Sequence, residues 1–304
     1  MEKVCVLLST YNGRRFIKEQ LETIYNQTYP GFITIQIRDD GSTDDTVSII
    51  KEFPQTENRK IIMTKGMNIG PQKSFLELIR KSEEADYYFF SDQDDIWYAD
   101  KIEKAVTAMR GKTSPMCYCT NYDVYNSILD VKRNAVIQRK PDFTPIKIIL
   151  YNQIPGCVIG FNKAMMSVLK EIKLDNVMMH DSMVLSLAAS VGEILYDHEP
   201  GISHRIHGEN AVGEGHRKII PHKWMAEKIK LVIEKDDYDI SRMADEFLKT
   251  GRVKEKYVAD LKLIRDYKKS IQNTFRLLRH PDTHDVWYDR TTLSIRFRIL
   301  LHVF

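Results

Sequence analysis

The feature that most constrains this chain is a run of four aromatic residues, Tyr87–Phe90, followed almost at once by an acidic cluster. The cluster holds Asp92, Asp94 and Asp95 within four positions. A short apolar run that ends in acids is typical of a buried strand in an open α/β sheet, where ligands bind beyond the carboxyl ends of the strands. Carboxylates this close repel one another unless a cation neutralises them, and oxygen ligands suit hard ions such as Mg²⁺ or Mn²⁺. The pattern therefore predicts a metal site, with a solvated acidic turn that caps the next helix as the alternative.

Three earlier stretches repeat this arrangement of a short apolar run followed by polar residues. The first of them, Val4–Leu8, is a continuous apolar run, as in a strand covered on both faces. Segments with apolar residues at helical spacing stand between the runs. Alternating strands and helices with polar residues at the strand ends are typical of a parallel nucleotide-binding sheet. We expect strands at Val4–Leu8, Ile33–Ile37, Ile61–Met63 and Tyr87–Phe90, and helices over Phe16–Ile24, after Thr46 and over Ser74–Lys81.

The residues at these strand ends exclude two common ways of holding a nucleotide. A dinucleotide fold carries Gly-x-Gly-x-x-Gly after its first strand and a P-loop carries Gly-x-x-x-x-Gly-Lys-Ser/Thr, and the sequence contains neither in such a place. The remaining way to hold a diphosphate is a metal bridge, which Asp92 and Asp94 are placed to supply.

Four motifs in fixed order carry a resemblance to a known family. Ser9–Asn12, then Asp39–Thr46, then Asn68-x-Gly70, then Asp92–Asp95 are similar to the ordered signature of family 2 glycosyltransferases with the GT-A fold, over roughly residues 3–210. The resemblance implies an α/β fold with a mixed, mainly parallel Rossmann-like sheet flanked by helices. It also implies a nucleotide-sugar donor, a divalent metal and inversion at the anomeric carbon.

The resemblance gives individual residues a role. It implies that Thr10 and Tyr11 lie under the base, that Asp39 binds the base edge, that Asp92 contacts the ribose and that Asp94 coordinates the metal. The other residues expected in the nucleotide-sugar site are Asn12, Asp40, Asn68, Gly70 and Gln93. Taken alone, the Asp40–Ser42 stretch has a local alternative, a turn with a helix N-cap.

An inverting transfer needs a base that takes the proton of the acceptor hydroxyl. We choose Asp181, which begins a helix-like apolar run where the family carries an acid pair. His180 stands in place of the usual Glu, so its role is open, and we place it near the acceptor or diphosphate. The alternative for Asp181 is a plain helix N-cap.

The stretch Ser203–Gly213 is rich in cationic and polar side chains, although it lacks the Gln-x-x-Arg-Trp motif that the family often has nearby. Arg205 suits a diphosphate, and the resemblance favours His207 over His204 as a second metal ligand, with a surface histidine as the alternative. The further candidates for the acceptor or diphosphate site are Gly156 and Cys157 in a wall loop, and Trp97 as a stacking ring whose alternative is core packing.

The stretch Ser91–Trp97 followed by Lys101 most resembles the rhamnosyltransferase-like branch of the family. It implies dTDP-L-rhamnose as donor, with UDP-hexoses open, and a glycan or lipid-linked acceptor in cell-surface polysaccharide synthesis. An alternative of another class is a non-catalytic sugar-nucleotide-binding or scaffold protein, although such a protein has little reason to keep both Asp94 and Asp181.

Charge is unevenly distributed along the 304 residues, whose formal net charge is +3. Residues 216–304 carry 20 Lys and Arg against 13 Asp and Glu, whereas residues 1–215 carry 25 against 29. We predict a catalytic domain over 1–215 and a basic helical region over 216–304. Helical spacing of apolar residues predicts helices at Lys223–Glu234, Ile240–Leu248 and Val253–Leu278.

The last segment, Leu293–Phe304, combines apolar and basic residues. One hypothesis is an anchor on an anionic membrane surface. The other is a helix that packs on the catalytic domain or on a second subunit of a homodimer.

The remaining composition indicates a cytoplasmic protein that could be peripheral on the inner face of the plasma membrane. The sequence begins with a strand-like run rather than a signal peptide, and no apolar stretch approaches the roughly 18–20 residues of a spanning helix. The basic residues form no recognisable nucleic-acid module. We expect the four cysteines to be reduced structural thiols: Cys5, Cys117, Cys119 and Cys157.

Overall fold

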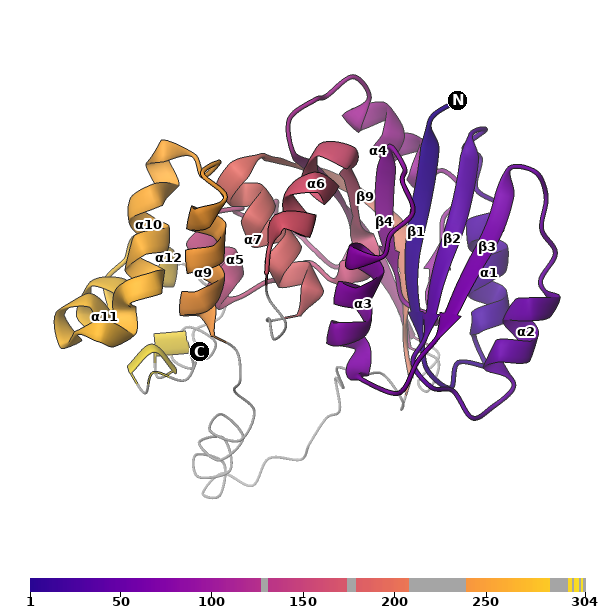
Figure 1. Ribbon diagram of the computed structural model, residues 1–304, viewed down its shortest axis with the longest axis horizontal. Helices are drawn as coiled ribbons and strands as arrows, with labels where there is room; N and C mark the ends of the chain where they lie inside the picture. Colours follow the sequence, from indigo (N-terminus) through magenta and orange to yellow (C-terminus); the bar gives the residue numbers. More distant parts are fainter. Residues whose placement is uncertain are drawn as a thin grey trace. The chain divides into compact units, whose positions relative to one another are not determined.

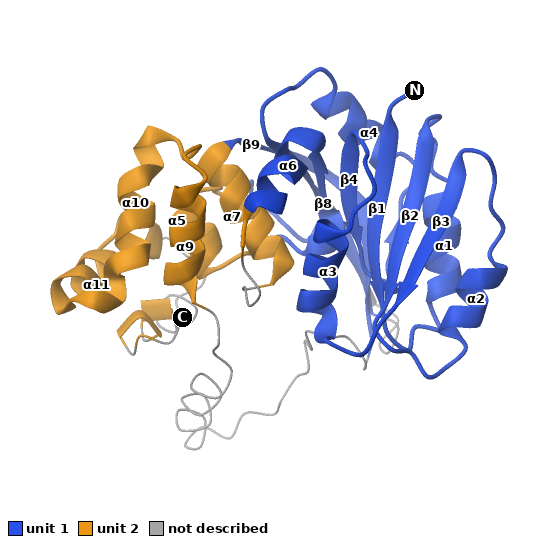
Figure 2. Cartoon of the chain, in the orientation of Figure 1, with its two compact units in different colours: residues 1–141, 154–171, 192–211 blue, residues 142–153, 172–191, 212–304 orange. Residues whose placement is uncertain are grey.

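The computed structural model describes residues 1–126, 131–173, 179–207, 239–284, 295–296, 298–300 and 302. The chain divides into two compact units (Figure 2), each assembled from separate segments. Unit 1 contains residues 1–141, 154–171 and 192–211, and unit 2 contains residues 142–153, 172–191 and 212–304. The predicted domain boundary at residue 215 lies outside the described residues and stays a prediction.

Unit 1 is built on one nine-stranded sheet of order β3-β2-β1-β4-β8-β6-β9-β5, with β7 paired to β6. The pairs β3-β2, β2-β1 and β1-β4 are parallel, while β8 is antiparallel to both of its neighbours. The mixed, mainly parallel sheet expected from the resemblance is confirmed. The strands are β1 (Lys3–Thr10), β2 (Phe32–Asp39), β3 (Arg59–Lys65), β4 (Tyr87–Ser91), β5 (Ile96–Trp97), β6 (Met116–Asn126), β7 (Val131–Arg133), β8 (Ile159–Asn162) and β9 (Glu193–Ile206).

Helices cover both faces of this sheet. In Figure 1, α3 and α6, which contact each other, lie in front of the strands, and α1 lies behind them. The central strands are therefore buried on both sides, as the continuous apolar run of β1 requires. The helices of unit 1 are α1 (Ile17–Tyr25), α2 (Thr46–Glu52), α3 (Gly70–Arg80), α4 (Lys101–Met109) and α6 (Lys163–Glu171), with a short 3₁₀ turn η1 (Gly156–Val158).

Unit 2 is helical in its described part. Its elements are α5 (Pro145–Leu150), α7 (His180–Val191), α9 (Ile240–Lys249), α10 (Glu255–Asp266), the 3₁₀ turn η2 (Tyr267–Lys269), α11 (Ile271–Leu278) and α12 (Pro281–His284). None of the described helices has both the length and the apolar character needed to cross a bilayer.

Two helix predictions for unit 2 are decided by these bounds. The helix over Ile240–Leu248 is confirmed to within one residue. The single helix over Val253–Leu278 is wrong, because η2 interrupts it and the Ser270 hydroxyl accepts a hydrogen bond from the Asn273 amide as the N-cap of α11. The helix predicted over Lys223–Glu234 lies outside the described residues.

The four cysteines are buried and free. Burial raises the pKa of the Cys5 thiol to about 12 and that of Cys157 well above its ordinary value. They are packing thiols, as expected from the sequence.

Candidate active site

The polar ends of the parallel strands meet at one edge of the unit 1 sheet. Thr10 lies beside Asp39 in the register of β1 and β2, and Leu8 lies beside Ser91 in the register of β1 and β4. Parallel pairing thus places the loops after these strands next to one another, as the sequence pattern predicted.

Gln93 ties two of these loops together. Its side-chain oxygen accepts hydrogen bonds from the Thr10 hydroxyl at 2.6 Å and the Tyr11 amide at 2.9 Å, and its nitrogen donates to the Tyr11 carbonyl at 3.2 Å. A Cβ at Gly13 would lie 2.3 Å from that oxygen, so a larger residue there would displace the Gln93 side chain. Tyr11 is 46% exposed, so a ligand can reach this residue.

Asn12 joins the same loop to the turn after β2. Its amide donates to the Ser42 hydroxyl at 2.9 Å, and its side-chain oxygen accepts from the Thr43 amide at 2.9 Å. Asn12 and Gly41 both have positive φ, 48° and 86°, which suits asparagine and glycine. The Asn12 side chain is therefore occupied in shaping the rim of the site.

Asp39 is completely buried and only half satisfied. One carboxylate oxygen, Oδ2, accepts from the Ser42 amide at 3.1 Å. The other, Oδ1, has no hydrogen-bond partner among the residues that the structure describes. A buried acceptor without a donor is costly, so this oxygen is a place where a ligand N–H would be stabilising.

Asp40 has a different environment from its neighbour. It forms an ion pair with Arg38 and accepts from the amides of Ile69 and Gly70 at 2.9 and 2.8 Å. The Asn68 side chain also accepts from the Gly70 amide, at 3.2 Å. Asp40 therefore fixes the start of α3, and a contact of Asp40 with the donor stays a prediction.

The pairing of β5 with β9 brings the distant end of β9 to the loop Asp92–Asp95, the acidic loop. Ile96 lies beside Ser203 and Trp97 beside Ile202. Two carboxylate–imidazole pairs result. Oδ2 of Asp94 lies 2.8 Å from Nε2 of His207, and Oδ1 of Asp95 lies 2.7 Å from Nδ1 of His204.

The Asp94–His207 pair is the more suitable of the two to hold a metal. Its side chains are 12% and 5% exposed, and Phe16 stacks on the His207 ring with centroids 4.4 Å apart. Burial and the Asp95 carboxylate raise the pKa of Asp94, so the anion lacks sufficient compensation. Neighbouring ligands of an octahedral ion with bonds near 2.1 Å lie about 3 Å apart, so the separation of these two atoms fits a shared divalent cation.

The second pair has the more deeply buried carboxylate, and the sequence reasoning missed this pair. Asp95 is completely buried, and its carboxylate raises the pKa of His204 to about 9 against the opposing effect of burial. Asp95, His204 and the Cys157 thiol present ligand atoms within 4.8 Å of one another. A metal-bound cysteine must be a thiolate, and the raised pKa of Cys157 opposes this.

Lys101 also supports the acidic loop from below. Its side chain is buried, donates a hydrogen bond to the Cys157 carbonyl and lies 3.5 Å from the centroid of the Trp97 ring. Burial lowers the pKa of Lys101 to about 7, which Asp95 and Asp92 partly oppose. Since protonated His204 already lies beside Asp95, we assign Asp95, His204 and Cys157 to support of the loop rather than to metal binding.

Three residues expected near the acceptor or diphosphate are buried. Trp97 is 3% exposed and packs against Phe89, which corresponds to the core-packing alternative. Gly156 and Cys157 are buried in η1. Contacts of these residues with a substrate stay predictions.

Arg205 lies at the rim. It bonds Glu19 at 2.7 Å and its guanidinium stands 5.0 Å from the centroid of the Phe16 ring, the ring that also stacks on His207. Asp92 is half-buried and lies close enough to His204 and Lys101 to act on the pKa of both.

Asp181 and His180 belong to unit 2, at the start of α7. The Asp181 carboxylate accepts from the Ser182 amide at 2.6 Å and bonds to the Asn152 side chain. Burial raises the pKa of Asp181 to about 6, against the lowering effect of these bonds. His180 is buried, and burial lowers the pKa of His180 to about 3, so its ring is neutral.

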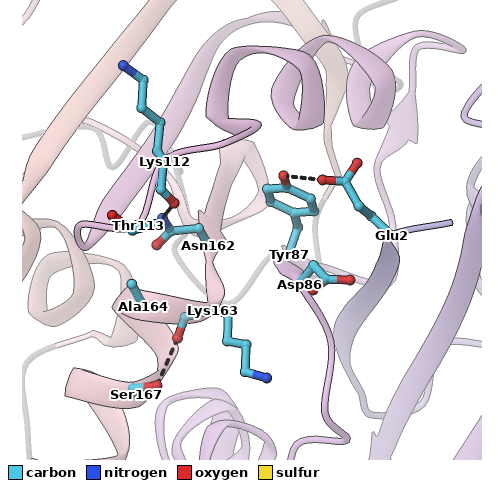
Figure 3. A pocket seen from close by; sticks show the side chains of 9 residues that line it. All are labelled: Glu2, Asp86, Tyr87, Lys112, Thr113, Asn162, Lys163, Ala164 and Ser167. Carbon is cyan, nitrogen blue, oxygen red and sulfur yellow. Dashed lines mark hydrogen bonds between the residues drawn. The ribbon is translucent and has the colours of Figure 1, made fainter.

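A pocket of about 330 Å³ lies at the opposite edge of the unit 1 sheet (Figure 3). Glu2 and Tyr87, at the starts of β1 and β4, line it with Lys112, Asn162 and Lys163. The Glu2 carboxylate bonds the Tyr87 hydroxyl, and Asn162 donates to the carbonyls of Lys112 and Ser114. These polar groups satisfy one another, and none of the predicted site residues lies in the pocket.

The sequence and fold are similar to those of known glycosyltransferases. Residues 5–173 match the family model described as glycosyl transferase family 2. The dTDP-rhamnosyl transferase RfbG of Shigella flexneri is 32% identical over 217 residues, which cover 68% of this chain and 73% of that protein. The putative teichuronic acid biosynthesis glycosyltransferase TuaG of Bacillus subtilis is 27% identical over 40% of this chain and 47% of its own.

Solved structures share the fold at low sequence identity. One is the crystal structure of S. aureus TarS, residues 1–349, in complex with UDP-GlcNAc. Its alignment covers 99% of this chain and 81% of the TarS chain, with a TM-score of 0.59 and 17% identity. The mannosyltransferase PcManGT from Pyrobaculum calidifontis, in complex with GDP-Man and Mn²⁺, covers 99% and 80%, with a TM-score of 0.52 and 16% identity.

Proposed function

Since this chain belongs to the family 2 glycosyltransferases, we propose that it transfers L-rhamnose from dTDP-L-rhamnose to a hydroxyl of a glycan or lipid-linked acceptor. The product belongs to a cell-surface polysaccharide. The identity to RfbG, a dTDP-rhamnosyl transferase, supports this donor. A UDP-hexose is the alternative donor for the same fold.

The observation that carries the proposal is the Asp94–His207 pair. These residues are 113 positions apart, yet they present a carboxylate oxygen and an imidazole nitrogen 2.8 Å apart beside the strand ends. A carboxylate and a neutral histidine are ligands that Mn²⁺ accepts readily.

A divalent metal held by Asp94 and His207 would neutralise the charge that develops on the leaving diphosphate. Side chains of the protein are assigned the remaining tasks, which are binding the phosphate and the base and accepting the proton. Arg205 is a donor suited to a phosphate oxygen, and its contacts with Glu19 and Phe16 limit the positions of its guanidinium.

The free oxygen of Asp39 suits the base of the donor. Thymine and uracil both present an imide N–H, and Oδ1 of Asp39 is a buried acceptor that lacks a donor within the described part of the chain. Because this oxygen is shielded from solvent, binding requires a small opening of the side chains around it. Tyr11 offers an exposed ring for stacking at the same edge.

Asp181 is the proposed general base. Its pKa of about 6 leaves it mainly ionised at neutral pH and still basic enough to accept a proton. The acceptor oxygen forms a bond to C1 of the sugar as the bond from C1 to the diphosphate oxygen breaks. The proton of the hydroxyl passes to Asp181, and attack opposite the leaving group inverts the configuration.

A lipid-linked acceptor would require the enzyme to work at the membrane surface. We propose a cytoplasmic protein with peripheral attachment to the inner face of the plasma membrane.

A screen of donors tests the proposal. The melting temperature is measured with dTDP-rhamnose, UDP-glucose, UDP-galactose, UDP-GlcNAc and GDP-mannose, each with Mn²⁺, with Mg²⁺ and with EDTA. A ligand that binds only the folded state raises its stability, so dTDP-rhamnose should give the largest metal-dependent shift. A larger shift with a UDP-sugar would identify that UDP-sugar as the donor instead of dTDP-rhamnose. Shifts that EDTA does not reduce would exclude a metal from donor binding.

A further inference from the structure

The helix α11 of unit 2 has two unlike faces. Thr274, Leu277 and Leu278 point inward and are buried. Ile271 and Phe275 lie one turn apart on the outward side and are 76% and 48% exposed. These two large apolar side chains form a small exposed patch, and such a patch marks an interaction site when polar residues surround it.

Cations surround this apolar pair. Lys268 and Lys269 precede the helix, and Arg276 and Arg279 follow on its outer face, all of them exposed. Lys269 forms an ion pair with Asp266 at 2.6 Å, and Lys268 lies 3.9 Å from Asp239. Between Asp266 and Asp282 the sequence contains no acidic residue. The outer face of α11 is therefore basic as well as apolar.

The described part of the C-terminal segment does not cover this face. Ile295 and Ile299 are buried, and His302 contacts Thr274 and the ring of Tyr267, which belong to the inward side. The described residues of Leu293–Phe304 therefore pack within unit 2, and the two hypotheses for the whole segment stay predictions.

A second copy of the chain is also a poor candidate to bind this face of α11. In a symmetric dimer the same patch meets itself, so the two sets of Lys and Arg would face each other. An anionic lipid surface matches both properties, because Ile and Phe enter the boundary of the acyl chains while Lys and Arg meet the headgroups.

We propose that the outer face of α11, consisting of Ile271 and Phe275 with Lys268, Lys269, Arg276 and Arg279, docks on an anionic lipid bilayer. This deepens the proposed function, since it names the surface by which the enzyme reaches a lipid-linked acceptor. It moves the membrane contact from the segment Leu293–Phe304 to α11.

Vesicle co-sedimentation of the full chain, without donor or acceptor, tests the proposal. The protein is mixed with vesicles of phosphatidylcholine alone or with about one third phosphatidylglycerol. We expect binding to the anionic vesicles that falls about tenfold or more in Ile271→Ser/Phe275→Ser and in Arg276→Glu/Arg279→Glu. Since all four residues are exposed, the variants should keep the melting temperature of the wild type.

A matched control removes the same charge elsewhere. Lys51→Glu/Lys60→Glu alters two exposed lysines of unit 1 and changes the net charge by the same amount. Binding by this variant should stay within about twofold of wild type at physiological salt, where distant charges are screened. Equal losses in the two charge variants would overturn the proposal in favour of a net-charge effect.

Two further results would overturn it. One is binding of the wild type that is equal on neutral and anionic vesicles or absent on both. The other is a dimer in solution that only the α11 variants dissociate, because a second copy would then be the occupant. Donor binding in the thermal screen is independent of vesicles, so failure of the membrane proposal is distinguishable from failure of the proposed activity.

Discussion

Asp39 and Asp40 are adjacent aspartates, yet the structure predicts different effects for their replacement by asparagine. In Asp39→Asn the amide oxygen can keep the bond to the Ser42 amide, while the NH₂ group takes the place of the unpartnered Oδ1. Folding should change by less than about 1 kcal/mol, because no existing bond is lost.

Donor binding should weaken strongly in the same variant. The NH₂ group of the asparagine would face the imide N–H of thymine, donor against donor. Loss of a hydrogen bond to a charged acceptor costs about 1.5–3 kcal/mol, which corresponds to a Kd roughly tenfold to a hundredfold higher.

Asp40→Asn should instead destabilise the fold. The change removes the negative charge of Asp40 from its buried ion pair with Arg38. The remaining acidic partner of the Arg38 guanidinium is Glu77, whose Oε2 lies 2.5 Å from Nε of Arg38. Breaking a buried pair costs about 3–5 kcal/mol, and since Glu77 remains we expect about 3 kcal/mol. For a unit of this size the melting temperature should fall by roughly 6–12 °C.

Thermal unfolding and calorimetric titration with dTDP-rhamnose measure both effects on the two variants. The reasoning fails if Asp39→Asn binds the donor as tightly as wild type, or if it loses as much stability as Asp40→Asn. In the first case Oδ1 of Asp39 is not a ligand contact. In the second it has a structural partner.

Three further outcomes follow from the geometry. Asp181→Asn should keep donor binding while the transfer rate falls about 10²- to 10⁴-fold, and normal transfer by this variant would exclude Asp181 as the base. The wild-type transfer rate should fall as the pH drops below about 6, which product formation measured across pH checks. Asp94→Ala and His207→Ala should each reduce the affinity for Mn²⁺ about tenfold or more by titration calorimetry, whereas an unchanged affinity would exclude that residue as a ligand. The pKa of His204 is raised to about 9, so its contribution to stability is complete below about pH 6.5 and is lost as the pH rises through 9. The difference in melting temperature between wild type and His204→Gln should therefore narrow over that range. A constant difference would show that His204 is not charged.

The sequence predicted most of what local patterns determine. Runs rich in apolar residues and ending in polar ones predicted the first four strands, and the continuous apolar run of β1 reflects a strand covered on both faces. The order of the motifs predicted that the residues at those strand ends would meet, and the described structure brings Thr10, Asp39 and Gln93 to one edge.

The contacts that depend on distant pairing were harder to predict. The strand-like stretch Glu193–Asp197 is followed by Pro200 and Gly201, residues that ordinarily end a strand. In the structure β9 continues to Ile206 through register shifts against β6 around Asn121. That continuation places His204 beside Asp95, a contact that no local pattern shows.

Lys101 was noticed only as part of a motif. Its burial beneath the acidic loop depends on the packing of α4, where Ile102 donates its amide to Gln27 of the loop after α1. A lysine beside an aromatic residue is ordinarily solvated, so sequence alone gave no signal for a buried ammonium.

The helix α7 has a consequence for how this protein can be divided. Ten of its twelve residues are buried, so it has no solvent face of its own, and α5 and α9 contact it. The Lys254 amide, in the segment between α9 and α10, also donates to the Ser190 carbonyl near its end. A chain cut after residue 215 would keep every motif of the sheet but leave α7 bare on the side of α9. Loss of residues 216–304 would thus disturb Asp181, the proposed general base, because Asp181 begins the helix that those residues shelter.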